Sequence, residues 1–577
     1  MTMAAAAVII SLSLILKLVS SANPTEMWGY RPKTDVTDFL ELDLDKASMD
    51  IELRIAAVDN YESAYGLYAE GGFSHSYAEI TLSDPQGLRI PLDKGTSVEG
   101  TSNSGQTVNG EVMRDLDIGE VTIPVRYKYP PYDRGDATTC VVGSLPSIGI
   151  QVINGCLIES GTALFGIGKE PYQYYYNVLR DNNNEMTMKK LSSMTEDLML
   201  VCENGCPHSM FYKYFKYYKV PDYSDRWVTA AFNLTNTVLY RGNANFTRYI
   251  EKKDGGNNRV INKDAQTQAI KIATLCLNIW MYITYKMDLA MNSCDDPSGE
   301  PDIASWDAAF ALFTGSLDHV KEDHNETVSG NPTKITRKAK GHMFHSLTDE
   351  LCTSFRTCDS ENGVEGPSTI TVALLRGFRL GQEFLTTREC QVAKDVQRVM
   401  QNAMVVPLLQ ALLLHTYERI AATKVLWSEA KSTAYAAAVL PVLHACSESD
   451  AQVVHDIVSQ HEPDGSSRLL TLKDFQSVKK ALERNYECLG ITCVDVGGLW
   501  DQSRATYMDG ATPCHLYLNK VGKKSFALAL LGVFGALSLM FLVVFLVKRW
   551  GIRKKQKDTE VVPLTIQSSP SNLRNIV

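Results

Sequence analysis

Short runs of alternating apolar and polar residues mark the N-terminal part of the chain. The clearest runs are MDIELRIAAV (49–58), FSHSYAEITL (73–82) and GEVTIPVRYKY (119–129). A period of two is typical of half-buried β-strands, because successive side chains point to opposite faces. Turn-rich stretches separate the runs, at DPQG (84–87) and across 95–110. We therefore predict that residues 23–164 form a β-rich domain with an antiparallel β-sandwich-like fold, which acts as a separate supporting or partner-contact module.

From about residue 165 the apolar positions recur at helical spacing. The longest such stretch, 391–422, contains Pro407, which we expect to kink the helix or split it in two. Further helices are predicted at 264–291, 305–318, 427–445, 450–460 and 471–486. Residues 165–514 are therefore expected to form one large all-helical domain with cysteine-containing loops, so the fold class is α+β and multidomain.

An apolar stretch at the N-terminus predicts a secretory signal. Residues 4–16 are apolar but too short to span a bilayer, and no basic residue precedes them. The small residues Ser20 and Ala22 then provide a plausible cleavage site. We interpret residues 1–22 as a signal peptide.

A second apolar stretch predicts a single transmembrane helix. Residues 525–547 carry no charge over 23 positions, enough to cross ~30 Å of hydrocarbon as a helix. Six Lys or Arg residues follow between 548 and 557, which predicts that the tail, 548–577, is cytoplasmic. Residues 515–524 form a short juxtamembrane linker. The chain is therefore predicted to be a type I single-pass protein of the plasma membrane with an extracellular ectodomain.

Composition and charge narrow the classes of partner. With 577 residues, 45% hydrophobic and 21% charged, most of the chain is expected to fold. The net charge is -9, and removing the tail (+5) and Lys17 (+1) leaves -15 for the mature ectodomain. This excess of negative charge argues against nucleic acid as a partner and is compatible with cations.

The cysteines and sequons agree with a secretory route. All 13 cysteines lie between Cys140 and Cys514, which indicates disulfides in an oxidising compartment, and an odd number leaves at least one outside an internal pair. We expect Cys140 and Cys156 to clip the last strands of the β-rich domain. Close spacing predicts small disulfide loops at Cys202–Cys206, Cys352–Cys358 and Cys488–Cys493. Glycosylation is predicted at Asn233, Asn245 and Asn325.

No motif for enzyme chemistry was found. The chain has no phosphate-binding G-x-x-x-x-G-K-[ST] loop, no H-E-x-x-H zinc helix and no G-x-S-x-G nucleophile elbow. His342 and His345, three residues apart, could meet a metal on one helical face, although a solvated or capping role is commoner for such a pair. We therefore do not expect an enzyme.

The most unusual local chemistry is phenolic. Nine tyrosines lie between positions 172 and 223, accompanied by Asp222 and Asp225. Fe³⁺ is a hard cation that prefers phenolate and carboxylate oxygens to sulfur ligands, and it lowers the pKa of a coordinated phenol by opposite-charge stabilisation. Aromatic residues at helical spacing more often pack in a core, so composition alone leaves both interpretations open.

The helical part resembles a known family. SWDAAFALFTGSLD (305–318) is similar to the W-D-x-x-x-A-x-Y-x-G-S-L-E signature of the low-iron-inducible algal periplasmic iron-assimilation proteins and the phytotransferrins. Collinear similar segments are FKYYKVPDYSDRWVTAAF (215–232), LTDELCTSFRTC (347–358), GFRLGQEFL (377–385), MVVPLLQALLLHTYE (404–418) and AYAAAVLPVLHAC (434–446). The single-span anchor resembles the membrane-bound phytotransferrins. The chain departs from the family at Phe313, where the signature has Tyr, and at His345, in a segment where the family has Leu-Tyr-x-Leu-Ala-Asp.

The resemblance implies capture of ferric iron at the cell surface with carbonate as a synergistic anion, followed by internalisation and release in an acidified endosome. It also implies endocytic or reductase partner proteins. On this basis we predict the iron ligands Tyr218, Asp222, Tyr223, Asp307, Tyr417 and His444. The predicted anion-binding residues are Arg226, Arg376 and Arg379. The alternative is a surface receptor or adhesion protein that binds glycan or protein through the β-rich domain.

Overall fold

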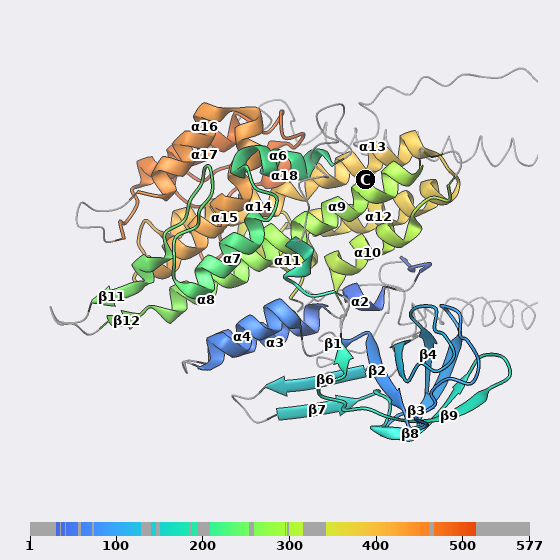
Figure 1. The fold of residues 1–577 in the computed structure, drawn as a ribbon. Helices are drawn as coiled ribbons and strands as arrows, with labels where there is room; N and C mark the ends of the chain where they lie inside the picture. The colour runs from blue at the N-terminus through green and yellow to red at the C-terminus, as the bar shows by residue number, and fades with distance from the viewer. Residues whose placement is uncertain are drawn as a thin grey trace, which may run out of the picture.

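The computed structural model places a β-rich part beside a larger helical part (Figure 1). It describes residues 30–514, with gaps at 35, 41, 56–58, 72–73, 128–139, 146–149, 184–185, 193–207, 253–258, 295, 297–298, 316–341 and 461–466. The predicted signal peptide, juxtamembrane linker, membrane span and cytoplasmic tail lie outside the described residues.

The β-rich part extends beyond residue 165. Its strands are β1 (Ser74–His75), β2 (Tyr77–Leu82), β3 (Ser97–Thr101), β4 (Thr107–Val112), β5 (Thr122–Tyr127), β6 (Cys140–Leu145), β7 (Ile150–Asn154), β8 (Ser160–Phe165), β9 (Glu170–Tyr175) and β10 (Asn182–Asn183). Burial alternates along β2 and β5, as their sequence pattern predicts. The strands predicted within 73–82 and 119–129 are therefore confirmed.

The main sheet is a closed antiparallel barrel, and the predicted sandwich is wrong. The strand order is β10-β2-β5-β4-β3-β8-β9, and a further pairing of β2 with β9 joins Leu82 to Tyr174 and closes the sheet. Alternating burial is the same for a sandwich and a barrel, so the pattern along the chain could not separate them. Closure also removes the exposed edges that an open sheet would present.

A small second sheet, β1-β6-β7, lies next to the barrel. Its β6–β7 hairpin is joined by the Cys140–Cys156 disulfide, with 4.2 Å between the two Cα atoms. The predicted disulfide is therefore confirmed, although β8 and β9 follow it, so it does not join the last strands.

Three helices lie between residues 37 and 70, and because residues 49–54 belong to one of them, the strand predicted at 49–58 is wrong. The helices are α2 (Thr37–Leu40), α3 (Leu42–Arg54) and α4 (Asp59–Glu70). Leu42, Met49 and Leu53 of α3 join the core of the helical part rather than that of the barrel. The misassignment has a physical reason: α3 is buried on its charged faces as well as its apolar ones, so it lacks the polar stripe that marks a surface helix.

The helical part is built mainly from α-helices. They are α6 (Ser209–Tyr218), α7 (Tyr223–Asn233), α8 (Lys263–Ala273), α9 (Trp280–Cys294), α10 (Ile303–Thr314), α11 (Phe344–Phe355), α12 (Thr369–Thr386), α13 (Cys390–Ala403), α14 (Val405–Glu418), α15 (Val425–Cys446), α16 (Glu448–Val458), α17 (Leu472–Glu483) and α18 (Cys493–Val496). Two hairpins, β11–β12 (Ile250–Lys252, Arg259–Ile261) and β13–β14 (Trp500–Asp501, Thr506–Tyr507), interrupt them. Every predicted helix is confirmed within the described residues.

Proline and a π-helical turn shape the two longest helical stretches. The 391–422 stretch is split at Met404, which leaves Pro407 in the first turn of α14, where its missing N–H group costs no helical hydrogen bond. Between α8 and α9 the turn at Thr274–Ile279 is π-helical. Cys390–Glu418 is long and apolar enough to cross a membrane by length and composition alone, but 78% of its apolar window is buried inside the protein, as in a core helix.

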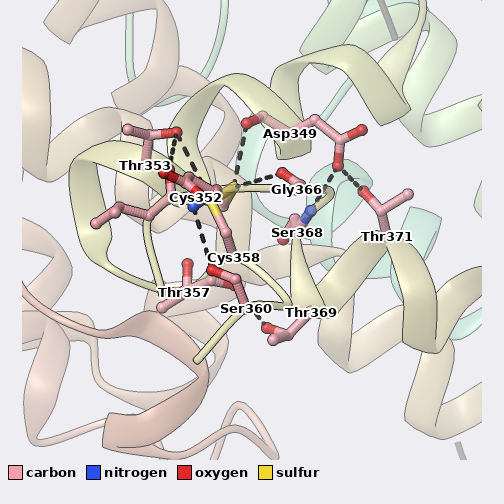
Figure 2. Close-up of a disulfide and its surroundings, with 12 residues drawn as sticks. Asp349, Cys352, Thr353, Thr357, Cys358, Ser360, Gly366, Ser368, Thr369 and Thr371 are labelled. Carbon is pink, nitrogen blue, oxygen red and sulfur yellow. Dashed lines mark hydrogen bonds between the residues drawn. A yellow bond between two sulfur atoms is a disulfide. The ribbon is translucent and has the colours of Figure 1, made fainter. Parts of the chain in front are cut away.

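Disulfides fix the ends of several helices. Cys294–Cys390, Cys446–Cys488 and Cys493–Cys514 join distant segments, so the loop predicted between Cys488 and Cys493 is wrong. Cys352–Cys358 is confirmed, and Figure 2 shows how the loop after it is held near Asp349, which accepts hydrogen bonds from the Ser368 N–H (2.8 Å) and Thr371 hydroxyl (2.6 Å). Cys276 is free and buried, whereas Cys202 and Cys206 lie outside the described residues.

Candidate functional site

The tyrosines predicted as iron ligands lie in an aromatic core. The rings of Tyr218 and Tyr223 are stacked with centroids 4.9 Å apart, and Tyr214 stacks on Tyr223 at 5.5 Å. The Tyr218 hydroxyl donates a hydrogen bond of 2.7 Å to the carbonyl of Ala437. That carbonyl is one that Pro441 cannot bond within α15, because proline has no N–H group. Tyr218 thus donates the hydrogen bond that residue 441 of α15 cannot donate.

Burial keeps these phenols neutral. It raises the pKa of Tyr214, Tyr218 and Tyr223 well above the ordinary value, since a buried phenolate loses its hydration. The Tyr223 hydroxyl has no hydrogen-bond partner among the described residues. These tyrosines therefore have the surroundings of packing residues, which is the alternative that the sequence left open.

The other predicted ligands are spread over separate places. Asp222 forms a surface ion pair of 2.8 Å with Arg226, and the two side chains are each 43% exposed. His444 accepts from the Arg241 guanidinium at 2.6 Å and packs its ring on Tyr217. Tyr417 is half-buried and packs edge-on against a phenylalanine of α17.

Asp307 anchors the N-terminal segment. Its carboxylate is fully buried and accepts hydrogen bonds from the Tyr30 hydroxyl and from Gln382 Nε2 (2.7 Å). It also accepts from the N–H groups of Lys33 (2.7 Å) and Thr34 (2.9 Å) and from the Thr34 hydroxyl (2.9 Å). The donors of Tyr30, Lys33 and Thr34 hold the N-terminal segment against α10, and Gln382 joins the same carboxylate from α12, so the acceptor capacity of Asp307 is used within the protein.

The predicted anion-binding arginines do not converge. Arg376 and Arg379 are exposed on α12, and Arg226 is paired with Asp222 on α7. Two of the predicted glycosylation sites, Asn233 and Asn245, are exposed, as a glycan requires, and Asn325 lies outside the described residues.

His342 and His345 do not share a site. His342 Nδ1 lies 3.2 Å from the buried carboxylate of Asp50 on α3. Lys46 (3.1 Å) and Lys271 (3.3 Å) contact the same carboxylate. Burial raises the pKa of Asp50, but these positive neighbours and the His342 hydrogen bond outweigh it and hold the pKa far below its ordinary value. The His345 ring is buried, with its Nδ1 directed at the Phe313 carbonyl at 3.2 Å.

A different cluster of ionisable residues lies where α11, α14 and α15 meet. Its members are Glu350 of α11, His415 and Glu418 of α14, and Lys431 and Tyr435 of α15. His415 and Glu418 are three residues apart on α14, and Lys431 and Tyr435 are four residues apart on α15, so the members of each pair lie on one face of their helix. α14 packs against both α11 and α15, and the carboxylates of Glu350 and Glu418 influence the ionisation of His415, Lys431 and Tyr435.

His415 contacts two other members of the cluster. His415 Nδ1 lies 2.7 Å from Glu418 Oε2, and the His415 ring stacks on the ring of Tyr435 with centroids 5.3 Å apart. Tyr435 and His415 are buried, Glu418 is 37% exposed at its side chain, and Glu350 is exposed. The cluster therefore leads from solvent to a buried phenol.

Burial dominates the ionisation of the cluster, and the charges of its members modify it. Burial lowers the pKa of His415, and the neighbouring carboxylates of Glu418 and Glu350 raise it by a smaller amount. Burial also lowers the pKa of the Lys431 ammonium, while the same two carboxylates raise it. The pKa of Tyr435 is raised well above its ordinary value, first by burial and also by the nearby negative charges. The phenol is therefore neutral unless a cation binds beside it.

The candidate donors for a trivalent cation in this cluster are two carboxylates and a phenol, which are hard oxygen donors, and one imidazole. Within the described residues, no group of three or more His, Cys, Asp or Glu side chains is close enough to hold a metal ion by itself. Metal binding here would need the Tyr435 phenolate or an added oxyanion as a further ligand. Lys431 provides positive charge beside the carboxylates that could hold such an anion.

Sequence reasoning missed this cluster although a signal was available. His415 and Glu418 lie in HTYE, within a segment used for the family resemblance, but only Tyr417 was selected from it. Lys431 and Tyr435 are four residues apart. Nothing local indicates that these pairs face each other.

Comparison with known proteins does not assign the chain to a family. No family model, no curated protein and no solved structure matches this chain, so its resemblance to the algal iron-assimilation proteins stays a prediction.

Proposed function

We propose that this protein binds ferric iron outside the cell for uptake, through the α11–α14–α15 cluster. The observation that supports this most directly is the convergence of three segments that carry the family resemblance. Residues 347–358 contribute Glu350, residues 404–418 contribute His415 and Glu418, and residues 434–446 contribute Tyr435. The three segments that resemble the algal iron-assimilation proteins thus supply the donors of the proposed site.

The donor set suits a hard trivalent cation. Carboxylate, phenolate and imidazole are ligands that Fe³⁺ accepts, and the cation lowers the phenol pKa enough for Tyr435 to ionise near neutral pH. Carbonate would bring further hard oxygens, with Lys431 as its positive partner. Iron binding would then displace the Tyr435 proton, so affinity should fall by about tenfold per pH unit for each proton displaced as the pH decreases. This direction agrees with release in an acidified endosome.

Ferric titration of the purified chain tests the proposal. Fe³⁺ is added with and without bicarbonate, and the visible phenolate-to-iron charge-transfer band is recorded together with the affinity. Tyr435→Phe should remove the band and weaken binding by at least about a hundredfold, as expected when a direct ligand is lost. Tyr417→Phe, on α14, and Tyr218→Phe, on α6, are matched controls, and each should keep the band.

The outcomes separate the two ligand sets. A band that survives in Tyr435→Phe but disappears in Tyr218→Phe or Tyr417→Phe would place the iron at the tyrosines predicted from sequence. If the parent chain shows neither a band nor heat of binding at any bicarbonate concentration, the uptake proposal fails.

A further inference from the structure

Residues 235–246 form a loop whose two arms run antiparallel. Asn236 and Asn245 pair across it as an antiparallel bridge, and next to this bridge the Thr237 N–H donates to the Ala244 carbonyl at 3.0 Å. Asn236 and Asn245 are therefore a pair without mutual backbone hydrogen bonds, in which the side chains lie closest together. Both side chains leave the same face of the loop.

This face is exposed and carries one apolar side chain. Burial alternates along the first arm, where Thr237 and Leu239 are buried and Asn236 and Val238 are exposed. The Val238 side chain is 77% exposed. Because Val238 lies two residues beyond Asn236, it is the diagonal neighbour of Asn245 on the same face, at a distance that a long side chain can bridge. An aliphatic side chain thus lies in solvent beside a predicted glycosylation site.

The Asn245 side chain is held in one orientation. Its Oδ1 accepts from the Thr247 N–H at 3.1 Å and from the Thr247 hydroxyl at 2.6 Å. Both hydrogen bonds use the oxygen, which leaves Nδ2 as the atom that can carry an N-linked glycan. Thr247 is the third residue of the same sequon, so the sequon itself orients the amide from which a glycan would extend.

The neighbouring sequon provides a comparison within the same molecule. Asn233 is also exposed, but it is the last residue of α7 and lies outside the 235–246 loop. A glycan on Asn233 therefore has no cross-strand position beside Val238. The two sites differ in the feature that matters here, which is an apolar neighbour on the same face.

We propose that a glycan on Asn245 packs on Val238 and covers the exposed face of the 235–246 loop. N-acetylglucosamine, the first sugar of an N-linked glycan, has an acetyl methyl group and a C–H face, which can remove the valine side chain from water. The partner of this apolar side chain is therefore carbohydrate carried by the same chain. The inference goes beyond the proposed iron binding and does not depend on it, because none of its residues belongs to the α11–α14–α15 cluster.

Site-resolved deglycosylation of the full-length chain tests the inference. The chain is produced in a eukaryotic cell and kept folded in detergent, and peptide-N-glycosidase, which converts a glycosylated asparagine to aspartate, is added. Mass spectrometry of the peptides then gives the release rate at each site. The Asn245 glycan should be released more slowly than the Asn233 glycan. Val238→Thr replaces one methyl group by a hydroxyl, and it should speed release at Asn245 by about threefold while leaving the rate at Asn233 unchanged.

A second exposed valine provides the matched control. Val494→Thr, at a position of α18 that is 65% exposed, should leave the rates at both sites as in the parent chain. The inference is overturned if Asn245 carries no glycan, or if Val238→Thr and Val494→Thr release the Asn245 glycan at the same rate. Equal acceleration at Asn233 and Asn245 in Val238→Thr also overturns it, because this would show a general loosening of the fold.

Discussion

Replacing Asp307 by asparagine should release the N-terminal segment from the helical part. One carboxylate oxygen accepts from the N–H groups of Lys33 and Thr34, and the other from Tyr30 and Gln382. An amide has the same shape but presents N–H₂ on one side, so the donors on that side lose their acceptor and face another donor. No flip of the amide avoids this conflict.

The magnitude follows from the number of bonds to charge. Each hydrogen bond to a charged group contributes about 1.5–3 kcal/mol, and breaking a buried charged network costs about 3–5 kcal/mol. We therefore expect the segment to be held about 4 kcal/mol less tightly. Since about 1.4 kcal/mol corresponds to a factor of ten, exchange should become faster by about a thousandfold.

Hydrogen exchange at the N–H groups of Lys33 and Thr34 measures this directly in the full-length chain. Asp302→Asn is the matched control on α10, because Asp302 caps the helix at Ser305 N and asparagine is an equally good cap. Exchange in Asp307→Asn within about twofold of the parent, the range of an ordinary surface substitution, would refute the anchoring role.

Three further predictions concern a buried imidazole, a buried hydrogen bond and a disulfide. Burial lowers the pKa of His345 to about 4 from an ordinary value of about 6.5, so on acidification the unfolded chain takes up a proton at this histidine before the folded chain does. The free energy of unfolding should therefore fall by about 2 kcal/mol between pH 7 and pH 5. In a series of denaturant titrations at different pH values, His345→Gln should reduce this fall. Tyr218→Phe leaves the Ala437 carbonyl without its donor and should lower the free energy of unfolding by about 1–2 kcal/mol in urea, and an unchanged midpoint would contradict the role assigned to that bond. Replacing Cys446 and Cys488 by serine opens a 42-residue loop and should cost about 4 kcal/mol by loop entropy, seen as a lower thermal midpoint; an equal midpoint would show that the reduced chain keeps the loop ordered.

Local patterns predicted the helices well but not the N-terminal region. The helices around 427–445 and 471–486 have long apolar periods, and both form with ends within a few residues of those predicted. At 49–58 the run of alternation is short, and packing overrides it: Asp50 and Glu52 are buried in α3. Lys46, Lys271 and His342 compensate for the buried charge of Asp50.

The candidate site was only partly accessible from sequence. The chemistry of phenols and carboxylates led to the prediction of Tyr218 and Asp307 as ligands. Both are buried, and the oxygens of both side chains form hydrogen bonds within the protein. His415 and Tyr435 belong to segments that were recognised, but their significance depends on a ring contact between two helices. No pattern along one helix records the residue that faces it from another.

The sequence by itself determined the positions of the helices in the C-terminal two thirds, the split near Pro407 and the Cys352–Cys358 loop, because periodicity, a missing N–H group and short spacing act within a few residues. Tertiary structure decided that the sheet closes into a barrel, that Cys488 pairs with Cys446, and that the His415 ring stacks on Tyr435. These features depend on which surfaces pack together, and packing is chosen by the total burial of the fold rather than by any one segment.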